Sequence, residues 1–231
     1  MRLGTKLHTK LRDHALMRKL AAEALGSAML LAAVVGSGIM GERLAGGNTA
    51  IALLANSLAT GAALFALITL FAPISGAHFN PVVTMIEAWS CRMPRWHAPF
   101  YLIAQFAGAI VGVVIAHLMF ELPLIQPSQH IRTGAAQWFS EFIATFGLLS
   151  VILHGSKSRV TTVAAMVACY ITAAYWFTAS TSLANPAVTL ARSLTDTFSG
   201  IRMIDVPMFM IAQVLGAIAA YVLYRWMVRE Q

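Results

Sequence analysis

Charged residues, cysteines and catalytic motifs are scarce in this chain. Only 11% of its 231 residues are charged whereas 58% are hydrophobic, a balance unlike that of a soluble domain. The two cysteines, Cys91 and Cys169, make no disulfide framework and lack the CxxC or Cys/His spacing typical of a metal site. There is no Ser/His/Asp set, phosphate-binding loop or zinc motif. We therefore expect a membrane protein that is not an enzyme and that holds neither a metal nor a cofactor.

The net charge of +7 does not indicate a nucleic-acid partner. The basic residues lie at the ends of apolar blocks, where lysine and arginine act as signals for membrane topology. The N-terminal stretch MRLGTKLHTKLRDHALMRKL is basic, but the apolar run after it is long and leads into further apolar blocks. We interpret this stretch as part of the protein and not as a cleaved signal peptide.

Long apolar runs dominate the rest of the chain. A spanning helix needs about 20 mostly apolar residues, and six windows meet this requirement: 19–41, 49–72, 98–120, 136–154, 160–180 and 206–228. Two further apolar segments begin at Asn80 and Asn185 and continue for only a turn or two. Because these two are too short to cross, the predicted fold class is an all-α membrane protein with six transmembrane helices plus two re-entrant half-helices.

The distribution of lysine and arginine predicts the orientation. An even number of crossings places both termini on one side of the membrane, and the side richer in basic residues is cytoplasmic. One side carries four of these residues, Arg43, Arg132, Arg192 and Arg202. The other carries twelve: Arg2, Lys6, Lys10, Arg12, Arg18, Lys19, Arg92, Arg95, Lys157, Arg159, Arg225 and Arg229. We therefore expect both termini in the cytoplasm.

The two halves of the chain share landmarks in the same order. Each half has a glutamate in its first span, Glu23 and Glu141, and an Asn-Pro pair further on. The third span of each half reads IAQFAGAI (103–110) or IAQVLGAI (211–218). These matches predict one channel domain over 1–231, built from a repeat at about 18–120 and a second at about 136–228. Three spans per repeat is an odd number, so the repeats are inverted relative to each other.

The two Asn-Pro pairs are read as helix starts in the middle of the membrane. Asparagine is a strong N-cap, and proline suits the first helical position because no N–H is needed there. Asn80-Pro81 and Asn185-Pro186 would thus begin two half-helices whose positive dipole ends meet at the midplane. Capping uses the side-chain oxygen, so we expect both amide NH2 groups to be free to donate into a lumen. This arrangement repels cations and predicts a passive channel for small uncharged solutes.

The segments SGAHFNPVVT and SLANPAVT resemble the two signature loops of the aquaporin and glycerol-facilitator family. The resemblance covers nearly the whole chain and implies a six-helix bundle with two half-helices, assembled as a homotetramer with one pore per subunit. The stretch NPAVTLARSLTDTFSGI is similar to a bacterial subgroup associated with arsenic-resistance genes. That similarity implies a multi-pass protein of the bacterial inner membrane, and it makes neutral arsenite a candidate solute beside water, glycerol, urea, boric acid and ammonia.

The resemblance also implies a wide outer selectivity filter. The family's usual filter arginine lies three residues after the second asparagine, where this chain has Val188. The family's spacing puts the other filter positions at Thr60, Ala173 and Ser182, all smaller than the aromatic and imidazole groups of water-selective members. We therefore expect glycerol-sized solutes to fit and water to have no special preference.

Two charged residues follow the half-helix starts at the same offset, Arg192 and Glu87. Arg192 lies one helical turn after Val188 and hence on the same face, so one hypothesis places it in the outer vestibule as a loose substitute for the filter arginine. Alternatively, it satisfies the C-terminus of its half-helix or pairs with Asp196. Glu87 is placed at the cytoplasmic vestibule, where a pairing with Arg92 or Arg95 is favoured.

Three other polar residues have two readings each. Glu23 and Glu141 could relay protons, but their matching places favour a structural buttress that fixes the backbone of each re-entrant loop. His78 could gate the cytoplasmic mouth on protonation or could simply hold its loop by a hydrogen bond. The alternative functions that remain open are a proton-coupled transporter that uses Glu23 or Glu141, and a non-conducting membrane protein of the same fold.

Overall fold

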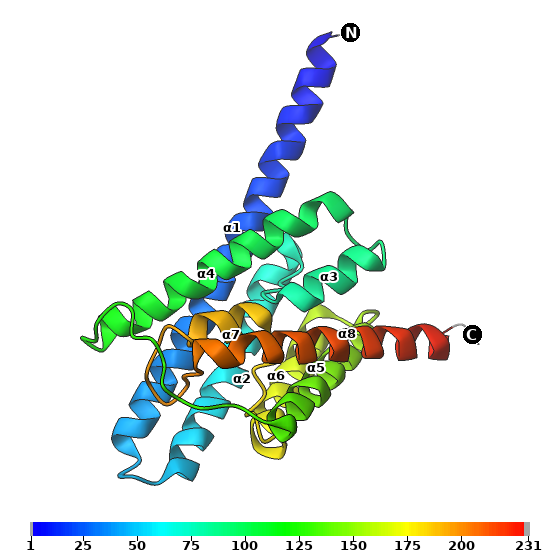
Figure 1. The fold of residues 1–231 in the computed structure, drawn as a ribbon. Coiled ribbons are helices and arrows are strands. Elements are labelled where there is room, and N and C mark those ends of the chain that lie inside the picture. Colours follow the sequence, from blue (N-terminus) through cyan, green and yellow to red (C-terminus); the bar gives the residue numbers. More distant parts are fainter. Residues whose placement is uncertain (1, 229–231) are drawn as a thin grey trace.

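The computed structural model describes residues 2–228, with side chains described for 14–228. Five of the predicted cytoplasmic basic residues, Arg2, Lys6, Lys10, Arg12 and Arg229, therefore lie outside the described side chains. Within the described part the chain forms eight α-helices (Figure 1): α1 (Arg2–Leu44), α2 (Thr49–Ser75), α3 (Pro81–Trp89), α4 (Ala98–Met119), α5 (Ala135–Gly155), α6 (Val160–Phe177), α7 (Pro186–Arg192) and α8 (Val206–Val228). Short 3-10 turns, η1 (Arg95–His97) and η2 (Met203–Asp205), precede α4 and α8.

Six of these helices are long and apolar enough to cross a membrane. In the described residues the candidate spans are His14–Leu44, Thr49–Ser75, Arg95–Met119, Ala135–Gly155, Val160–Phe177 and Met203–Val228. The six predicted spans are therefore confirmed. Their outer faces carry exposed hydrophobic side chains such as Leu70, Ile103 and Phe139, as expected of surfaces that contact lipid.

Local sequence signals explain where α2 begins and ends. The side-chain oxygen of Asn48 accepts hydrogen bonds from the N–H groups of Ala50 (3.0 Å) and Ile51 (3.3 Å), which caps the first turn. At the other end Gly76 adopts a left-handed conformation, φ 95°, and its N–H bonds to the carbonyl of Ala72. The chain then turns directly into the first re-entrant loop, so the glycine aims the loop back into the bundle.

Small residues let the long helices cross closely. Gly108 of α4 lies so near the carbonyl of Ala24 in α1 that a methyl group at Gly108 would overlap it. Gly216 of α8 has the same relation to the carbonyl of Phe142 in α5. The two halves thus use equivalent glycines at equivalent crossings, α1 with α4 and α5 with α8.

The half-helices α3 and α7 fill the space between the long helices. Both pack against α4 and α8, and they contact each other; Figure 1 shows α3 beside the beginning of α4 and α7 beside α8. Each half-helix enters from the loop that follows the second long helix of its half, α2 or α6. The loops that lead into α3 and α7 are thereby brought together inside the bundle.

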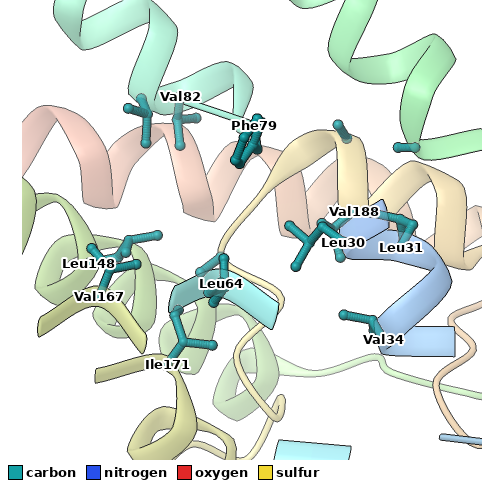
Figure 2. Close-up of a cluster of buried hydrophobic side chains, with 14 of the residues drawn as sticks. Leu30, Leu31, Val34, Leu64, Phe79, Val82, Leu148, Val167, Ile171 and Val188 are labelled. Carbon is teal, nitrogen blue, oxygen red and sulfur yellow. The ribbon is translucent and has the colours of Figure 1, made fainter. Parts of the chain in front are cut away.

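The main hydrophobic cluster surrounds an open space instead of filling the centre. Figure 2 shows members of this cluster from α1, α2, α5, α6 and α7. Many of the labelled side chains also line a cavity of about 410 Å³. These shared residues are Leu30, Val34, Leu64, Phe79, Leu148, Val167, Ile171 and Val188. The core of the bundle is therefore also the wall of an internal conduit.

Candidate functional site

Asn80 and Asn185 begin the two half-helices. The side-chain oxygen of Asn80 accepts from the N–H of Val82 at 3.1 Å. That of Asn185 accepts from the N–H groups of Ala187 (2.9 Å) and Val188 (3.3 Å). Pro81 and Pro186 occupy the first helical positions, where the missing N–H costs no hydrogen bond.

The amide groups of these two asparagines join the loops reciprocally. The amide nitrogen of Asn80 donates to the carbonyl of Ala184 at 2.8 Å, and that of Asn185 donates to the carbonyl of Phe79 at 2.7 Å. The expectation that both NH2 groups are wholly free is therefore wrong, because one N–H of each holds the opposite loop. An amide carries two N–H donors, and since both asparagines line the cavity, one donor from each is left for a solute.

Glu23 holds the first re-entrant loop from within the bundle. Its carboxylate is fully buried and accepts four hydrogen bonds. Two come from the backbone N–H groups of His78 (3.0 Å) and Phe79 (2.8 Å), and two come from the side chains of Ser75 (2.6 Å) and Gln105 (2.8 Å). With its oxygens occupied in this way, the carboxylate is a fixed part of the loop's hydrogen-bond network.

Glu141 makes the matching contacts in the second half. Its two oxygens accept from the backbone N–H groups of Leu183 and Ala184, both at 2.8 Å, and from the amide of Gln213 at 2.6 Å. Gln213 also bonds to Thr189 of α7 at 2.8 Å, so the glutamate, the half-helix and α8 are linked. Each re-entrant loop is therefore tied to an acid in the first helix of its own half.

The loops are held in backbone conformations that most residues avoid. Positive φ angles occur at Ala77 (51°), Phe79 (49°), Thr181 (60°), Ser182 (52°) and Ala184 (48°), and none of these is a glycine, for which such angles cost little. In each loop two successive N–H groups bond to a glutamate, those of His78 and Phe79 to Glu23 and those of Leu183 and Ala184 to Glu141. Of these positive-φ residues, all but Thr181 line the cavity.

The cavity has one polar wall and one apolar wall. The polar wall consists of the two loops, from Gly76 to Asn80 and from Ser182 to Asn185. The opposite wall is formed by aliphatic side chains of four long helices: Leu30, Val34, Leu64, Ile68, Leu148, Ile152, Val163, Val167 and Ile171. The conduit extends from Ser156 and Ser158, in the turn between α5 and α6, to Arg192 at the end of α7.

At the end near α3, the cavity is bordered by a salt bridge and a histidine. Glu87 pairs with Arg92, with 3.2 Å between the carboxylate and guanidinium atoms, and both residues line the cavity. This is the pairing that was favoured for Glu87. His78 lies deeper, and its Nδ1 is 3.0 Å from the hydroxyl of Thr84, which is the contact of a histidine that holds its loop.

The expected filter positions Thr60, Ser182 and Val188 all line the cavity, together with Tyr175. The hydroxyl groups of Thr60 and Tyr175 lie 3.2 Å apart. The hydroxyl of Ser182 is buried without a hydrogen-bond partner among the described residues. It is therefore a polar group that a solute in the cavity can satisfy.

Ala173 was expected here and is a wrong assignment. Its side chain is exposed on the outside of α6, and it does not border the cavity. Tyr175, two residues later, is buried and lines the cavity instead. The family's spacing therefore does not carry over to this position, because residue 173 lies on the exposed face of α6.

Arg192 is 2% exposed, yet it borders the cavity. Its Nε donates to the carbonyl of Ser199, and it does not pair with Asp196, whose carboxylate lies near His130 and accepts from the N–H of Gln129. Of the two earlier readings, the cavity position agrees with the vestibule hypothesis.

The comparison with known families decides the identity of the fold. The Major intrinsic protein family matches this chain over residues 10–159 and 153–231. The chain belongs to the major intrinsic protein family. The resemblance found in the signature loops is thereby confirmed, and the chain is a multi-pass membrane channel for small neutral solutes.

Individual members of the major intrinsic protein family extend this result. The chain is 54% identical to "Aquaglyceroporin AqpS" of Rhizobium meliloti over 95% of this chain and 94% of the relative. It is 28% identical to "Aquaporin Z" of Bradyrhizobium diazoefficiens over 93% and 95%. The X-ray structure of the aquaglyceroporin from Plasmodium falciparum superposes with a TM-score of 0.73, at 22% identity, over 90% of this chain and 95% of that one. This last likeness confirms the predicted fold class.

One residue at the outer end was missed by the sequence reasoning. Arg132, in the loop between α4 and α5, was counted only as an outward-facing basic residue. In the structure it borders a second hollow that also includes Arg192. Burial lowers the pKa of Arg132 to about 9, and the neighbouring Arg192 charge lowers it as well. A contact between distant loops leaves no periodic pattern in the sequence, so no motif could have located this residue.

Proposed function

We propose that this family member is a passive channel with a wide outer constriction. It conducts glycerol-sized polyols and neutral metalloid hydroxides such as arsenite, together with water. The observation that carries this proposal is the two-sided lumen, with loop carbonyls and asparagine amides on one wall and aliphatic side chains on the other. A small polyol has hydroxyl groups for the first wall and C–H groups for the second.

The outer constriction supports passage of solutes larger than water. Val188 stands where the family's usual pattern has an arginine, and Thr60, Ser182 and Tyr175 are the polar groups beside it. A trihydroxy solute can exchange its water for the unpartnered hydroxyl of Ser182 and for the asparagine amides. An ion cannot replace its water in this way, because the free energy needed to remove its water in an apolar site is much larger than the free energy gained from these neutral contacts.

The name of the 54% identical relative supports glycerol-type solutes, since that protein is called an aquaglyceroporin. Arsenite rests on the resemblance of residues 185–201 to the arsenic-associated subgroup and on chemistry, because arsenous acid is a neutral trihydroxide near pH 7. Its three hydroxyl groups present the same donors and acceptors as those of glycerol.

The hydrogen bonds and the location of the two buried glutamates favour passive flow over proton coupling. Glu23 and Glu141 each accept hydrogen bonds from two loop N–H groups, and protonation would weaken those bonds and release the loops. Neither acid borders the cavity. We assign both residues to the support of the re-entrant loops.

We further propose the membrane setting and assembly of the channel. Both termini lie in the cytoplasm of a bacterial inner membrane, as the twelve-to-four distribution of basic residues indicates. The subunits form a homotetramer, as the family resemblance implies, with a pore in each subunit. Exposed aliphatic side chains on several long helices, such as Leu54, Leu58 and Ile211, are available for contacts with lipid or with neighbouring subunits.

The function is tested by stopped-flow light scattering on proteoliposomes. Water, glycerol, urea and arsenite are supplied in separate runs, with protein-free liposomes as the control. We expect glycerol and arsenite to equilibrate faster than in the control and at rates that do not change when a pH gradient is imposed. Permeation of water alone would contradict the wide constriction, and uptake that exceeds equilibrium in a pH gradient would indicate a coupled transporter.

A further inference from the structure

A second hollow of about 410 Å³ lies beside the outer end of the conduit. It lies between the beginning of α2 and the loops around α7, and Arg192 borders both the hollow and the main cavity. Arg192 therefore forms part of the wall between the two spaces. The other residues that line the hollow are Thr49, Ala50, Leu53, Asn56, Arg132, Trp176, Thr181 and Phe198. Arg132 and Arg192 are its only charged residues among those described.

The side chain of Arg132 is fixed from two directions. Its Nε donates to the carbonyl of Gly200 at 2.8 Å, and its Nη1 donates to the carbonyl of Ser180 at 3.0 Å. A longer contact of 3.4 Å joins Nη1 to the hydroxyl of Thr181. These acceptors lie on the segments before and after α7. The guanidinium therefore connects the two sides of the outer mouth and keeps a constant position there.

The loop that carries Arg132 is held equally firmly. The N–H of Arg132 bonds to the carboxylate of Asp205 at 2.9 Å. Upstream, the N–H of Gln126 bonds to the carbonyl of Leu194 at 2.9 Å, and the N–H of Ser128 bonds to that of Ser193 at 3.0 Å. The loop between α4 and α5 thus runs along the segment that follows α7. Its backbone hydrogen bonds hold Arg132 at the outer mouth.

Neither arginine has a carboxylate in direct contact with its guanidinium group among the described residues. The negative charge of Glu141 acts on both guanidinium groups from a distance, while its oxygens accept hydrogen bonds from the second loop and not from the arginines. The hydrogen-bond partners of Arg132 are neutral carbonyl and hydroxyl groups, which orient its charge without cancelling it.

We propose that Arg132 is a second specificity-determining residue of this channel, acting with Arg192 as a two-arginine collar at the outer mouth. The collar raises the energy of a cation before it reaches the constriction, while Val188 leaves the constriction wide for neutral solutes. Selection by charge is thereby separated in space from selection by size. A single filter arginine would combine the two, because its side chain both repels cations and narrows the path.

The test compares cation leak with glycerol flux in the same proteoliposomes, and it rests on the proposed function because glycerol flux is the reference. Arg132→Gln should raise the potential-driven leak of protons and Na⁺ about tenfold, which corresponds to a barrier lower by about 1.4 kcal/mol. Glycerol flux should stay within about twofold of wild type. Arg132→Lys should keep the leak low, and a double variant with Arg192→Gln should leak more than either single variant.

Arg43→Gln is the matched control. Arg43 also lies at the outer side, at the end of α1, but it donates to the carbonyl of Phe120 and does not border the hollow. Its substitution should change neither rate. A wild-type protein that fails to conduct glycerol would contradict the proposed function itself, whereas normal glycerol flux with an unchanged leak in Arg132→Gln would overturn only the collar.

A second measurement does not depend on the folding of a variant. In wild-type proteoliposomes, external choline chloride is raised from about 10 mM to about 1 M, which shortens the screening length from about 30 Å to about 3 Å. Screening of the collar should increase the proton leak several-fold. If Arg132→Gln conducts no glycerol, this measurement decides alone, and a leak that does not respond to salt overturns the proposal.

Discussion

At the scale of single residues, Val188 and the two buried glutamates have different roles. Val188 borders the conduit, and its side chain has no polar atom that could bind a solute. Its contribution is that a small side chain leaves room for the solute to pass. Glu23 and Glu141 stand behind the loops and set the direction of their backbone N–H groups. Substitution of the first kind of residue should change selectivity, whereas substitution of the second kind should change whether the loops form.

Val188→Arg should make the channel more selective for water. The longer side chain fills part of the constriction beside Thr60 and Ser182, so glycerol flux should fall about tenfold or more, which corresponds to a barrier increase of about 1.4 kcal/mol. Water flux should fall less, because a water molecule is smaller and can bond to the new guanidinium. Stopped-flow scattering gives both rates, and Val188→Leu, which adds volume without charge, separates the two effects. Equal losses for both solutes would contradict a size effect.

Glu141→Gln should destabilise the protein and abolish flux. The amide keeps one acceptor but turns an NH2 group toward the N–H of Leu183 or Ala184, and an unsatisfied buried group costs about 1–3 kcal/mol, or more where a charge is involved. We expect a lower thermal unfolding temperature in detergent together with loss of glycerol flux. The control is Glu42→Gln, at an exposed position on α1, which should change neither. A stable variant that conducts normally would show that the loop does not need this carboxylate.

At the scale of elements, the half-helices could be predicted from sequence but the neighbouring loop geometry could not. The Asn-Pro pairs contain their own cap and first-turn residue, so α3 and α7 begin where the local sequence requires. Tyr175 and Arg132 depend on tertiary structure instead. Tyr175 lines the cavity through the packing of α6 in the bundle, and Arg132 is held by hydrogen bonds to Ser180 and Gly200, 48 and 68 residues away. Neither residue's position can be found by counting along the sequence.

Gly216→Ala should weaken the crossing of α5 and α8. A methyl group there would overlap the carbonyl of Phe142, and since both atoms belong to helix backbones, the helices have to separate. Overpacking of this kind typically costs about 1–3 kcal/mol. Thermal unfolding in detergent should show a lower midpoint, and Gly155→Ala is the matched control because a methyl group there meets only ordinary contacts beginning at 3.5 Å. Equal midpoints for the two variants would mean that the close crossing is not needed.

At the scale of the whole molecule, the two halves of the chain pack against each other along several helices, including α2 with α6, α4 with α7 and α3 with α8. Both halves place a buried acid behind a loop, a capped half-helix after it, and a glutamine on the third long helix. The basic residues are unevenly distributed across this symmetric frame. We therefore expect the placement of basic residues to set the orientation in the membrane.

Labelling of Cys91 tests the orientation. Cys91 is exposed between α3 and α4, on the side that we assign to the cytoplasm. A membrane-impermeant maleimide should label it in inverted membrane vesicles and not in intact cells. Cys169 is also exposed but lies within the α6 span, where lipid keeps the reagent away, and Cys91→Ser should therefore remove the signal. Labelling in intact cells would reverse the assigned orientation.

The reciprocal joint between the loops has a consequence for how the sequence can diverge. Asn80 and Asn185 each recognise a main-chain oxygen of the opposite loop, at Ala184 and at Phe79. A carbonyl is present whatever the side chain, so the partner positions already differ between an alanine and a bulky aromatic. Substitution of the side chain at Phe79 or Ala184 therefore leaves the acceptor of each hydrogen bond in place, whereas substitution of Asn80 or Asn185 removes the donor.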